Sequence, residues 1–169
     1  MFHEITPKEL CESPFSLIGN DWLLITAPDE TKESGANAMT ASWGGLGILW
    51  NKPVATIYVR PQRYTFELCE KSERISLCVL SEEQRSALKT CGTQSGKDLD
   101  KLKECRLTAT EIDGVKVIEQ SRLVIIGKKA YADYIKKDNF ADTSHLRHYP
   151  ADDFHRVYIL EIEKILVKD

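Results

Sequence analysis

Residues 37–43 read Asn37-Ala38-Met39-Thr40-Ala41-Ser42-Trp43 and predict a β-strand lined by small and hydroxyl side chains. Side chains alternate between the two faces of a strand, so the even-numbered residues lie on one face and the odd-numbered ones on the other. The short side chains leave room for a flat ligand beside the backbone, whose N–H and C=O groups can bond to a ring edge. Trp43 can shield such a ligand, although Met39 and Trp43 are equally typical of an ordinary core.

The segments that follow this strand place cations at unusual positions. Residues 54–59 form an apolar strand that ends in Arg60. Pro61 begins a predicted helix that runs to about residue 71, because proline is tolerated at the first helical position, and Arg63 falls in its first turn. A second helix is predicted over residues 95–105, with Lys97 in its first turn and Lys101 one turn later on the same face.

Cations at two helix starts point to a bound anion. A helix N-terminus carries roughly half a positive charge, which disfavours nearby cations by about 0.3–1 kcal/mol. A phosphate would remove the conflict by bonding to backbone N–H groups, to the cations, and to hydroxyls such as those of Thr65 and Ser95. Simpler alternatives remain, because Ser95 with Asp98 is also a plain capping box, Lys97 can face solvent, and Arg63 can pair with Glu67.

The rest of the chain predicts short strands around a few helices. We expect a hairpin over residues 15–26, a strand over 75–80, a helix from about residue 82 to 92, and long strands over 123–135 and 154–167. Asp113-Gly114 predicts a tight hairpin turn. Residues 44–47, which are rich in glycine, are interpreted as a flexible strand end, and residues 136–153 as a long loop of the kind that often carries function.

The order of strands, then three helices, then strands differs from the βαβ alternation of a parallel sheet. It predicts an α+β fold in which helices flank an antiparallel barrel or sandwich. A chain of 169 residues with 42% hydrophobic and 29% charged residues fits one globular domain, residues 1–169, and argues against disorder. A net charge of −3 argues against general nucleic-acid binding.

Several other classes of site and location find no support. We expect neither a signal peptide nor a membrane-spanning segment. The five cysteines are odd in number and lack CxxC spacing, which indicates reduced thiols and a cytoplasmic protein. The histidines lack the spacing of a metal site, and no dinucleotide-binding glycine fingerprint follows a strand.

Taken in order, these stretches resemble the flavin reductase-like proteins, a family that includes flavoredoxin and has the FMN-binding split-barrel fold. The likeness is carried by residues 37–43, 52–65 and 91–101, and the pattern of strands and helices agrees over residues 12–167. The resemblance implies an α+β, mostly antiparallel β split barrel with short flanking helices. It also implies a homodimer that binds FMN noncovalently.

The resemblance further implies which residues hold the cofactor. Asn37 and the backbone of residues 40–43 would flank the isoalloxazine ring, while the loop over residues 136–153 would help to cover it. His148 is the candidate in that loop, although an exposed loop histidine is the simpler interpretation. The phosphate would be held by Arg60, Arg63, Thr65, Ser95, Lys97 and Lys101. The full predicted cofactor-binding set is Asn37, Met39, Thr40, Ala41, Ser42, Trp43, Arg60, Gln62, Arg63, Tyr64, Thr65, Ser95, Gly96, Lys97, Lys101 and His148, with no catalytic acid or base and no metal ligand.

Three functions follow from this interpretation. The first is a reductase that uses NAD(P)H, bound transiently over the flavin, to reduce free flavin or another acceptor. The second is a flavoredoxin-type electron carrier that exchanges electrons with a redox partner protein. The third is a binding module without enzymatic activity that senses FMN or another flat anionic ligand. In the first two, the flavin carries the redox chemistry and the protein supplies orientation and electrostatics.

Overall fold

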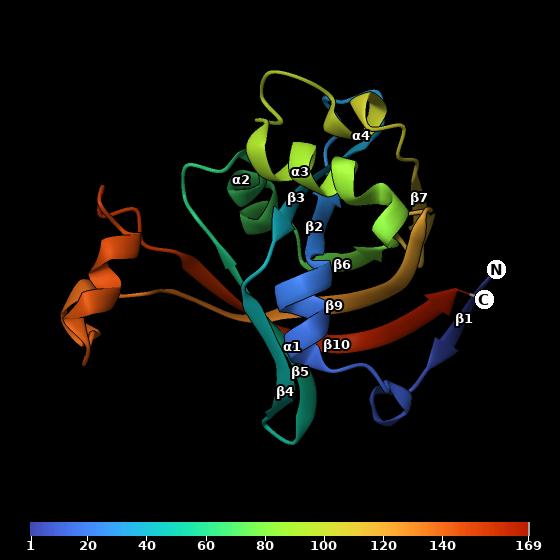
Figure 1. Cartoon of the computed structure of the whole chain (residues 1–169). Helices are drawn as coiled ribbons and strands as arrows, with labels where there is room; N and C mark the ends of the chain where they lie inside the picture. Colours follow the sequence, from blue (N-terminus) through green and yellow to red (C-terminus); the bar gives the residue numbers. More distant parts are fainter. Residues whose placement is uncertain (169) are drawn as a thin grey trace.

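A curled antiparallel sheet forms the body of the protein in the computed structural model, which describes residues 1–168 (Figure 1). Its strands follow the order β3-β2-β6-β9-β10-β5-β4, and β1 pairs with the far end of β10. The strands of this sheet are β1 (Phe2–Ile5), β2 (Leu23–Pro28), β3 (Ala36–Ala41), β4 (Gly44–Leu49), β5 (Lys52–Val59), β6 (Arg74–Leu80), β9 (Ser121–Tyr134) and β10 (Arg156–Lys168). A separate hairpin contains β7 (Ala109–Ile112) and β8 (Val115–Ile118).

The two edge strands of the sheet are consecutive in the chain. Only Ser42 and Trp43 separate the end of β3 from the start of β4, although these strands lie at opposite ends of the hydrogen-bonded order. The sheet therefore closes on itself through a covalent connection rather than through a ladder of hydrogen bonds, which leaves a split. Inside the curl, Ile25, Ile57 and Leu160 are fully buried in one hydrophobic core.

Three helices cover the β2 and β3 side of the barrel (Figure 1). They are α2 (Tyr64–Lys71), α3 (Arg85–Thr93) and α4 (Lys101–Glu104). A second core lies beneath α3 and α4, where Ala38 of β3 packs with buried Leu88, Cys91 and Leu102. Strand β3 is thus packed on both faces, and its outer edge lies beside α3.

A long segment between β9 and β10 projects from the other end of the barrel (Figure 1). It contains the 3-10 helices Lys137–Asn139 and Thr143–His148. The remaining short helices are the 3-10 turns Pro7–Glu9 and Glu82–Gln84, helix α1 (Pro14–Ser16) and a π-helical turn over Leu17–Asp21. No helix within residues 1–168 combines the length and apolar character needed to cross a membrane.

The predicted fold class, α+β with a mostly antiparallel sheet and short flanking helices, is confirmed. The turn at Asp113-Gly114 is confirmed as well. Both residues have positive φ, 50° and 78°, which a two-residue hairpin turn of this type requires.

Other sequence predictions were wrong at the element boundaries. Residues 15–26 are not a hairpin, because Pro14 starts a helical segment that buries Leu17 and Ile18, and strand β2 begins only at Leu23. The glycine-rich residues 44–47 belong to strand β4. A Cβ at Gly44 would lie 2.9 Å from the Thr56 carbonyl oxygen, so close pairing with β5 requires glycine there. Strand β1 was not predicted.

Both predicted helix starts near the cations were also wrong. Pro61 lies in a turn closed by the Arg63 N–H donating to the Arg60 carbonyl at 3.0 Å, and α2 starts at Tyr64 with Arg63 as its N-cap residue. The helix predicted from Ser95 starts at Lys101. Its N-cap is Asp100, whose carboxylate accepts the Lys103 N–H at 3.2 Å.

Candidate functional site

Two adjoining cavities lie at the split of the barrel. One, of about 180 Å³, follows the free edge of β3, and the other, of about 140 Å³, lies between the start of α2 and the loop before α4. Arg63 lines both cavities and so joins them. The first is lined by Met39, Thr40, Ala41, Ser42, Trp43, Tyr58, Arg60, Arg63 and His155. The second is lined by Gln62, Arg63, Tyr64, Thr65, Thr93, Gln94, Ser95, Gly96 and Lys101.

The smaller cavity, which we call the cation cavity, contains two positive charges that share one acceptor, the half-buried Arg63 and the buried Lys101. The Arg63 guanidinium donates to the Gly92 carbonyl at 2.9 Å and to the Cys91 carbonyl at 3.2 Å. The Lys101 ammonium, with only 3% of the residue exposed, donates to the same Cys91 carbonyl at 3.2 Å. Within residues 1–168, neither cation forms an ion pair with a carboxylate.

The electrostatic consequence is a site with excess positive charge, because no Asp or Glu stands among its described lining residues. Burial lowers the pKa of Arg63, and it lowers the pKa of Lys101 from 10.5 to about 8, with the neighbouring guanidinium adding to the effect. Buried charges are normally paired, because an unpaired charge loses its hydration without compensation. An anion with several acceptor oxygens is the ligand that would complete this arrangement.

A tight contact fixes the loop that forms one wall of the cation cavity. The Asn37 amide donates to the Thr65 hydroxyl at 2.8 Å, and both residues are buried. A Cβ placed on Gly96 would lie 2.3 Å from Asn37 Oδ1 and 2.6 Å from Tyr64 Cδ1. Position 96 therefore accepts only glycine, and the loop backbone approaches the strand and the helix directly.

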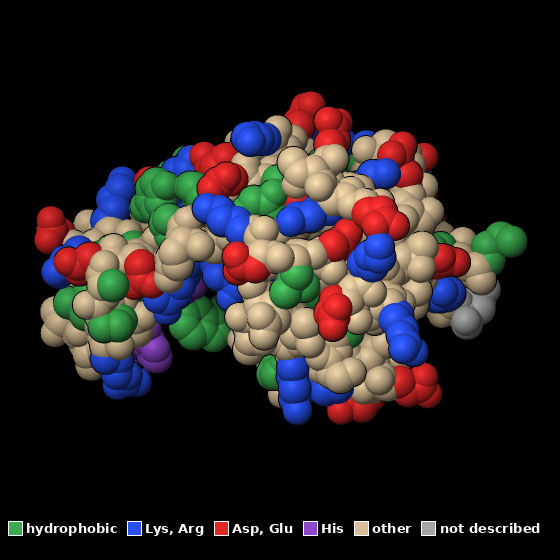
Figure 2. Space-filling model, turned by 90° about the horizontal axis from the view of Figure 1, so that it is seen from above, with side chains coloured by type: hydrophobic (Ala, Val, Ile, Leu, Met, Phe, Trp, Pro, Cys, Tyr) green, Lys and Arg blue, Asp and Glu red, His purple; other side chains and the backbone are tan. Residues whose placement is uncertain are grey.

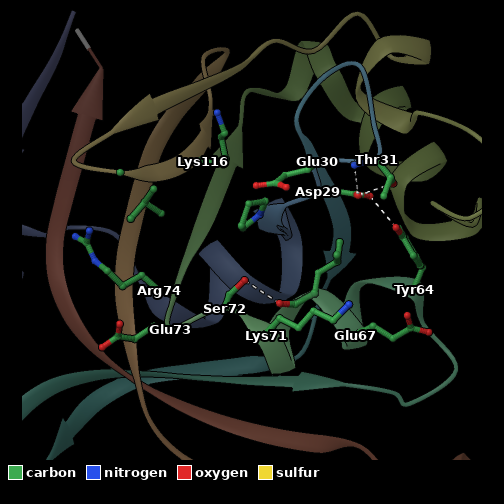
Figure 3. A pocket seen from close by; sticks show the side chains of 14 residues that line it. Asp29, Glu30, Thr31, Tyr64, Glu67, Lys71, Ser72, Glu73, Arg74 and Lys116 are labelled. Atoms are coloured by element: carbon green, nitrogen blue, oxygen red, sulfur yellow. Dashed lines mark hydrogen bonds between the residues drawn. The ribbon is translucent and has the colours of Figure 1, made fainter.

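A hydrogen-bonded brace holds the Tyr64 hydroxyl (Figure 3). The Tyr64 hydroxyl donates to Asp29 Oδ2 at 2.9 Å. The same buried carboxylate accepts from the backbone N–H of Thr31 at 3.1 Å and from its hydroxyl at 2.6 Å. Tyr64 lines the cation cavity as well as the separate cavity of Figure 3, so the brace holds its ring against the loop at Gly96.

The larger of the two cavities, which we call the edge cavity, combines aromatic rings with exposed strand backbone. Strand β3 pairs only with β2, so its other edge is outside the sheet ladder. Trp43 is 46% exposed, and its ring centroid lies 5.2 Å from that of His155 and 5.8 Å from that of His148. A planar group can therefore meet backbone donors and acceptors on one side and rings on another.

Sequence reasoning missed His155, which is buried in the wall of the edge cavity. Its Nδ1 lies 2.9 Å from the Tyr149 hydroxyl. Burial, reinforced by the positive charge of Arg60, lowers the pKa of His155 from 6.5 to about 4, so the ring is neutral at pH 7. The sequence offered little signal for it, because the residue lies just before β10 and its partners are fixed by the fold.

Arg60 and Gln62 bind the projecting segment. They are not part of the charged pair in the cation cavity, which is Arg63 and Lys101. Arg60 forms an ion pair with Asp153 and donates to the His148 carbonyl at 2.7 Å. Gln62 donates to the same Asp153 carboxylate at 2.5 Å. Arg60 thus lines the edge cavity with its charge already balanced, although it was predicted to bind phosphate.

Three predicted residues, Asn37, Lys97 and His148, lie outside both cavity linings, and Asn37 is hydrogen-bonded to Thr65 in the wall of the cation cavity. Lys97 is 61% exposed in its side chain and pairs with Glu67 at 3.4 Å, so Glu67 is not the partner of Arg63. His148 is exposed, with its ring edge toward Trp43.

Seen from above, a hollow separates the projecting segment from the rest of the molecule, and basic and hydrophobic side chains gather on its walls (Figure 2).

The curled antiparallel sheet and its split define a split-barrel protein, in which two cations without a carboxylate partner among residues 1–168 lie beside a free strand edge. The family model described as flavin reductase like domain matches residues 15–169, and the chain belongs to that family. No curated protein matches the sequence.

Solved structures share the fold at low sequence identity. An FMN-binding domain of a flavin reductases-like enzyme from Shewanella baltica has a TM-score of 0.67 and 16% identity, covering 99% of this chain and 77% of that one. Flavoredoxin of Desulfovibrio vulgaris has a TM-score of 0.68 and 17% identity, covering 97% and 78%. The styrene monooxygenase flavin reductase of Pseudomonas putida has a TM-score of 0.64 and 13% identity, covering 88% and 80%.

Proposed function

We propose that the protein is an FMN-dependent oxidoreductase that takes electrons from NAD(P)H. The observation that carries this proposal is the pair formed by the half-buried Arg63 and the buried Lys101, which share the Cys91 carbonyl and have no carboxylate partner within residues 1–168. The FMN phosphate is a dianion at neutral pH and would supply the missing charge. The names of the structural neighbours agree with a flavin as the ligand.

The surroundings of the cation pair fit a phosphate ester. The hydroxyls of Thr65 and Ser95 lie in the same cavity and add hydrogen-bonding groups, and the first turn of α2 contributes its N-terminal dipole. The edge cavity continues from Arg63 along β3, so a ligand held by its phosphate would reach the free strand edge with its ring. Asn37 would fix the wall between the edge cavity and the cation cavity, because it donates to Thr65 and lies close to Gly96.

The chain's own residues would bind, orient and shield the cofactor. FMN, when bound, exchanges two electrons with a nicotinamide at its N5 position. Trp43 would cover part of the ring site, and the projecting segment, anchored by Arg60 on Asp153, would limit access of water. His155 is neutral at pH 7 and would add no charge beside the ring. We assign no acid–base catalyst.

The first test is the visible absorption spectrum of the freshly purified protein, followed by titration with FMN. We expect a flavin spectrum, or uptake of about one FMN per chain, and bleaching by NADH or NADPH without oxygen. Protein that is colourless and fails to take up FMN refutes the cofactor assignment. Protein that binds FMN but is not bleached by either nicotinamide indicates the flavoredoxin-type electron carrier instead.

We also propose that the protein is a cytoplasmic homodimer. Exposed apolar side chains on the β4–β5 hairpin support a self-association surface, with Ile48 74% and Trp50 53% exposed. The five unpaired cysteines fit a reducing compartment. Sedimentation equilibrium would detect the dimer, and Trp50→Ser should weaken it; a wild-type protein that stays monomeric at all concentrations contradicts this part of the proposal.

A further inference from the structure

We infer that the electron acceptor is an uncharged ring compound of the quinone class, bound in a third cavity that shares Trp43 and other lining residues with the ring site. This inference rests on the proposed function. The cavity has a volume of about 620 Å³, within the range of about 300–1,000 Å³ that is usual for small-molecule sites. We call it the acceptor cavity.

The acceptor cavity and the edge cavity share a wall. Ser42, Trp43, Tyr58 and His155 line both of them. A molecule in the acceptor cavity would thus be next to the ring site, with side chains of this shared wall between them. The small residues Gly44 and Gly45 continue its lining along β4.

The chemical character of the walls selects an uncharged occupant. Among the described residues that line the acceptor cavity, there is no Asp, Glu, Lys or Arg. Ile18, Leu46 and Ile135 supply apolar surface, and Trp43 and Tyr58 supply aromatic rings. A charged substrate would lose its hydration here without gaining a partner, whereas a flat apolar ring would gain packing contacts.

A few hydrogen-bonding groups remain for carbonyl oxygens. The Ser42 hydroxyl, the Tyr58 hydroxyl and the Tyr149–His155 pair lie in the lining. The neutral state of His155 at pH 7 agrees with a cavity that carries no charge. A quinone, which is planar and uncharged and has two carbonyl acceptors, matches this pattern.

The overall reaction balances in atoms and electrons. NAD(P)H and one proton reduce one quinone to one hydroquinone and leave NAD(P)⁺. The nicotinamide C–H bond breaks, two electrons reach the quinone ring by way of the flavin, and both quinone oxygens end as hydroxyls. The nicotinamide supplies two electrons and one proton equivalent, and solvent supplies the second proton.

Binding and turnover of two matched compounds test the inference. The probes are 1,4-naphthoquinone and its 2-sulfonate, which differ by one negative charge. Calorimetric titration of the FMN-free protein should show binding of the uncharged quinone at least tenfold tighter than that of the sulfonate. With FMN and NAD(P)H present, kcat/KM should favour the uncharged quinone by a similar factor.

Variants at the wall separate the acceptor cavity from the rest of the site. Leu46→Asp should weaken binding of 1,4-naphthoquinone at least tenfold, and Ile135→Lys should do the same from another element. The control is Leu49→Asp on the same strand, outside the cavity lining, which should leave quinone binding unchanged. FMN affinity, measured on each variant, verifies that the protein is folded and that the flavin site is intact.

Equal affinity and equal turnover for the two probes overturn the inference. Absence of binding heat with both probes overturns it too, and this result is expected if a second copy of the chain fills the cavity. Unchanged quinone binding in Leu46→Asp and Ile135→Lys overturns it as well. The FMN titration distinguishes these results from failure of the proposed function, because wild-type protein that binds FMN but not the quinone refutes only the acceptor assignment.

Discussion

Replacing Lys101 with methionine should make the FMN-free protein more stable and its complex with FMN weaker. Methionine is unbranched and of similar length, so it fills the buried site while removing the charge. Lys101 is 3% exposed, and its only hydrogen-bond acceptor within residues 1–168 is the Cys91 carbonyl. No carboxylate of residues 1–168 offsets its positive charge, so the folded protein holds this ammonium at a cost that a bound anion would remove.

The stability change follows from the pKa of Lys101. The fold lowers this pKa from 10.5 to about 8. At about 1.4 kcal/mol per pKa unit, holding the ammonium in the folded protein destabilises it by about 3 kcal/mol. Because the folded-state pKa lies below the unfolded-state value, the destabilisation is complete below pH 8 and disappears as the pH rises toward 10.5. Methionine also loses one hydrogen bond of about 1 kcal/mol, so we expect a net gain of about 2 kcal/mol at pH 7.

The binding change has the opposite sign. A charge-assisted hydrogen bond to a phosphate contributes about 1.5–3 kcal/mol, so Lys101→Met should raise the Kd for FMN about tenfold to 150-fold. The control is Lys97→Met, because Lys97 is 61% exposed in its side chain and pairs with Glu67 at the surface. Its effect should stay below about 1 kcal/mol in both stability and binding.

Urea unfolding of the FMN-free proteins at pH 7 and pH 10 measures the first effect, and quenching of flavin fluorescence measures the second. The stability gain of Lys101→Met should be large at pH 7 and much smaller at pH 10. A variant that is less stable than wild type at pH 7 and binds FMN with unchanged affinity would refute the reasoning. A larger loss of FMN affinity in Lys97→Met than in Lys101→Met would refute it too.

Three further predictions concern the walls of the site. Gly96→Ala should weaken FMN binding at least tenfold, because the new Cβ would lie 2.3 Å from Asn37 Oδ1; Gly45→Ala, which meets nothing within 4 Å, is the control, and equal FMN affinities in the two variants would count against the close contact. Tyr64→Phe removes the hydrogen bond to Asp29 and should destabilise the protein by about 0.5–1.5 kcal/mol. The same variant should weaken binding of FMN but not of riboflavin, which lacks the phosphate, and an equal loss for both flavins would show that the brace does not act on the cation cavity. FMN should quench the fluorescence of Trp43, and Trp43→Phe should remove most of the change; quenching that persists in the variant would place the ring elsewhere.

The sequence predicted cations at two helix starts, but the structure places both starts elsewhere. Ser95 and Asp100 are both good N-cap residues, and the earlier one was chosen for the helix start. The structure starts α4 after Asp100, whose carboxylate accepts from the backbone N–H of Ser34 at 2.9 Å and from its hydroxyl at 2.8 Å. A contact across 66 positions settles the competition, and no local pattern contains it. The shift buries Lys101 and leaves Lys97 in solvent.

Contacts over long sequence separations also explain what sequence reasoning missed elsewhere. Arg60 was expected to meet phosphate, but Asp153, 93 positions later, balances its charge. Strand β4 escaped notice because glycine is depleted in strands and gives no alternating pattern. Its register is set by close approach to β5, which only the assembled sheet reveals. Predictions held where the signal was local and strong, as at the Asp113-Gly114 turn.

The weak points of the fold coincide with the candidate site, and the topology gives the reason. Ser42 and Trp43 join β3 and β4, which are the opposite edges of a seven-strand path. This connection prevents β3 from completing a ladder with another strand. A free strand edge is a liability that proteins usually pair, cover or charge. Here α3 covers part of it, and the Thr40 hydroxyl donates to the Leu88 carbonyl at 2.5 Å. The uncovered part runs toward Arg63, beside two cations that have no carboxylate partner in the described part of the chain. A ligand with a planar ring and a dianionic ester would satisfy the strand edge and the cations together, so the structural cost of the split and the affinity for such a ligand have the same origin.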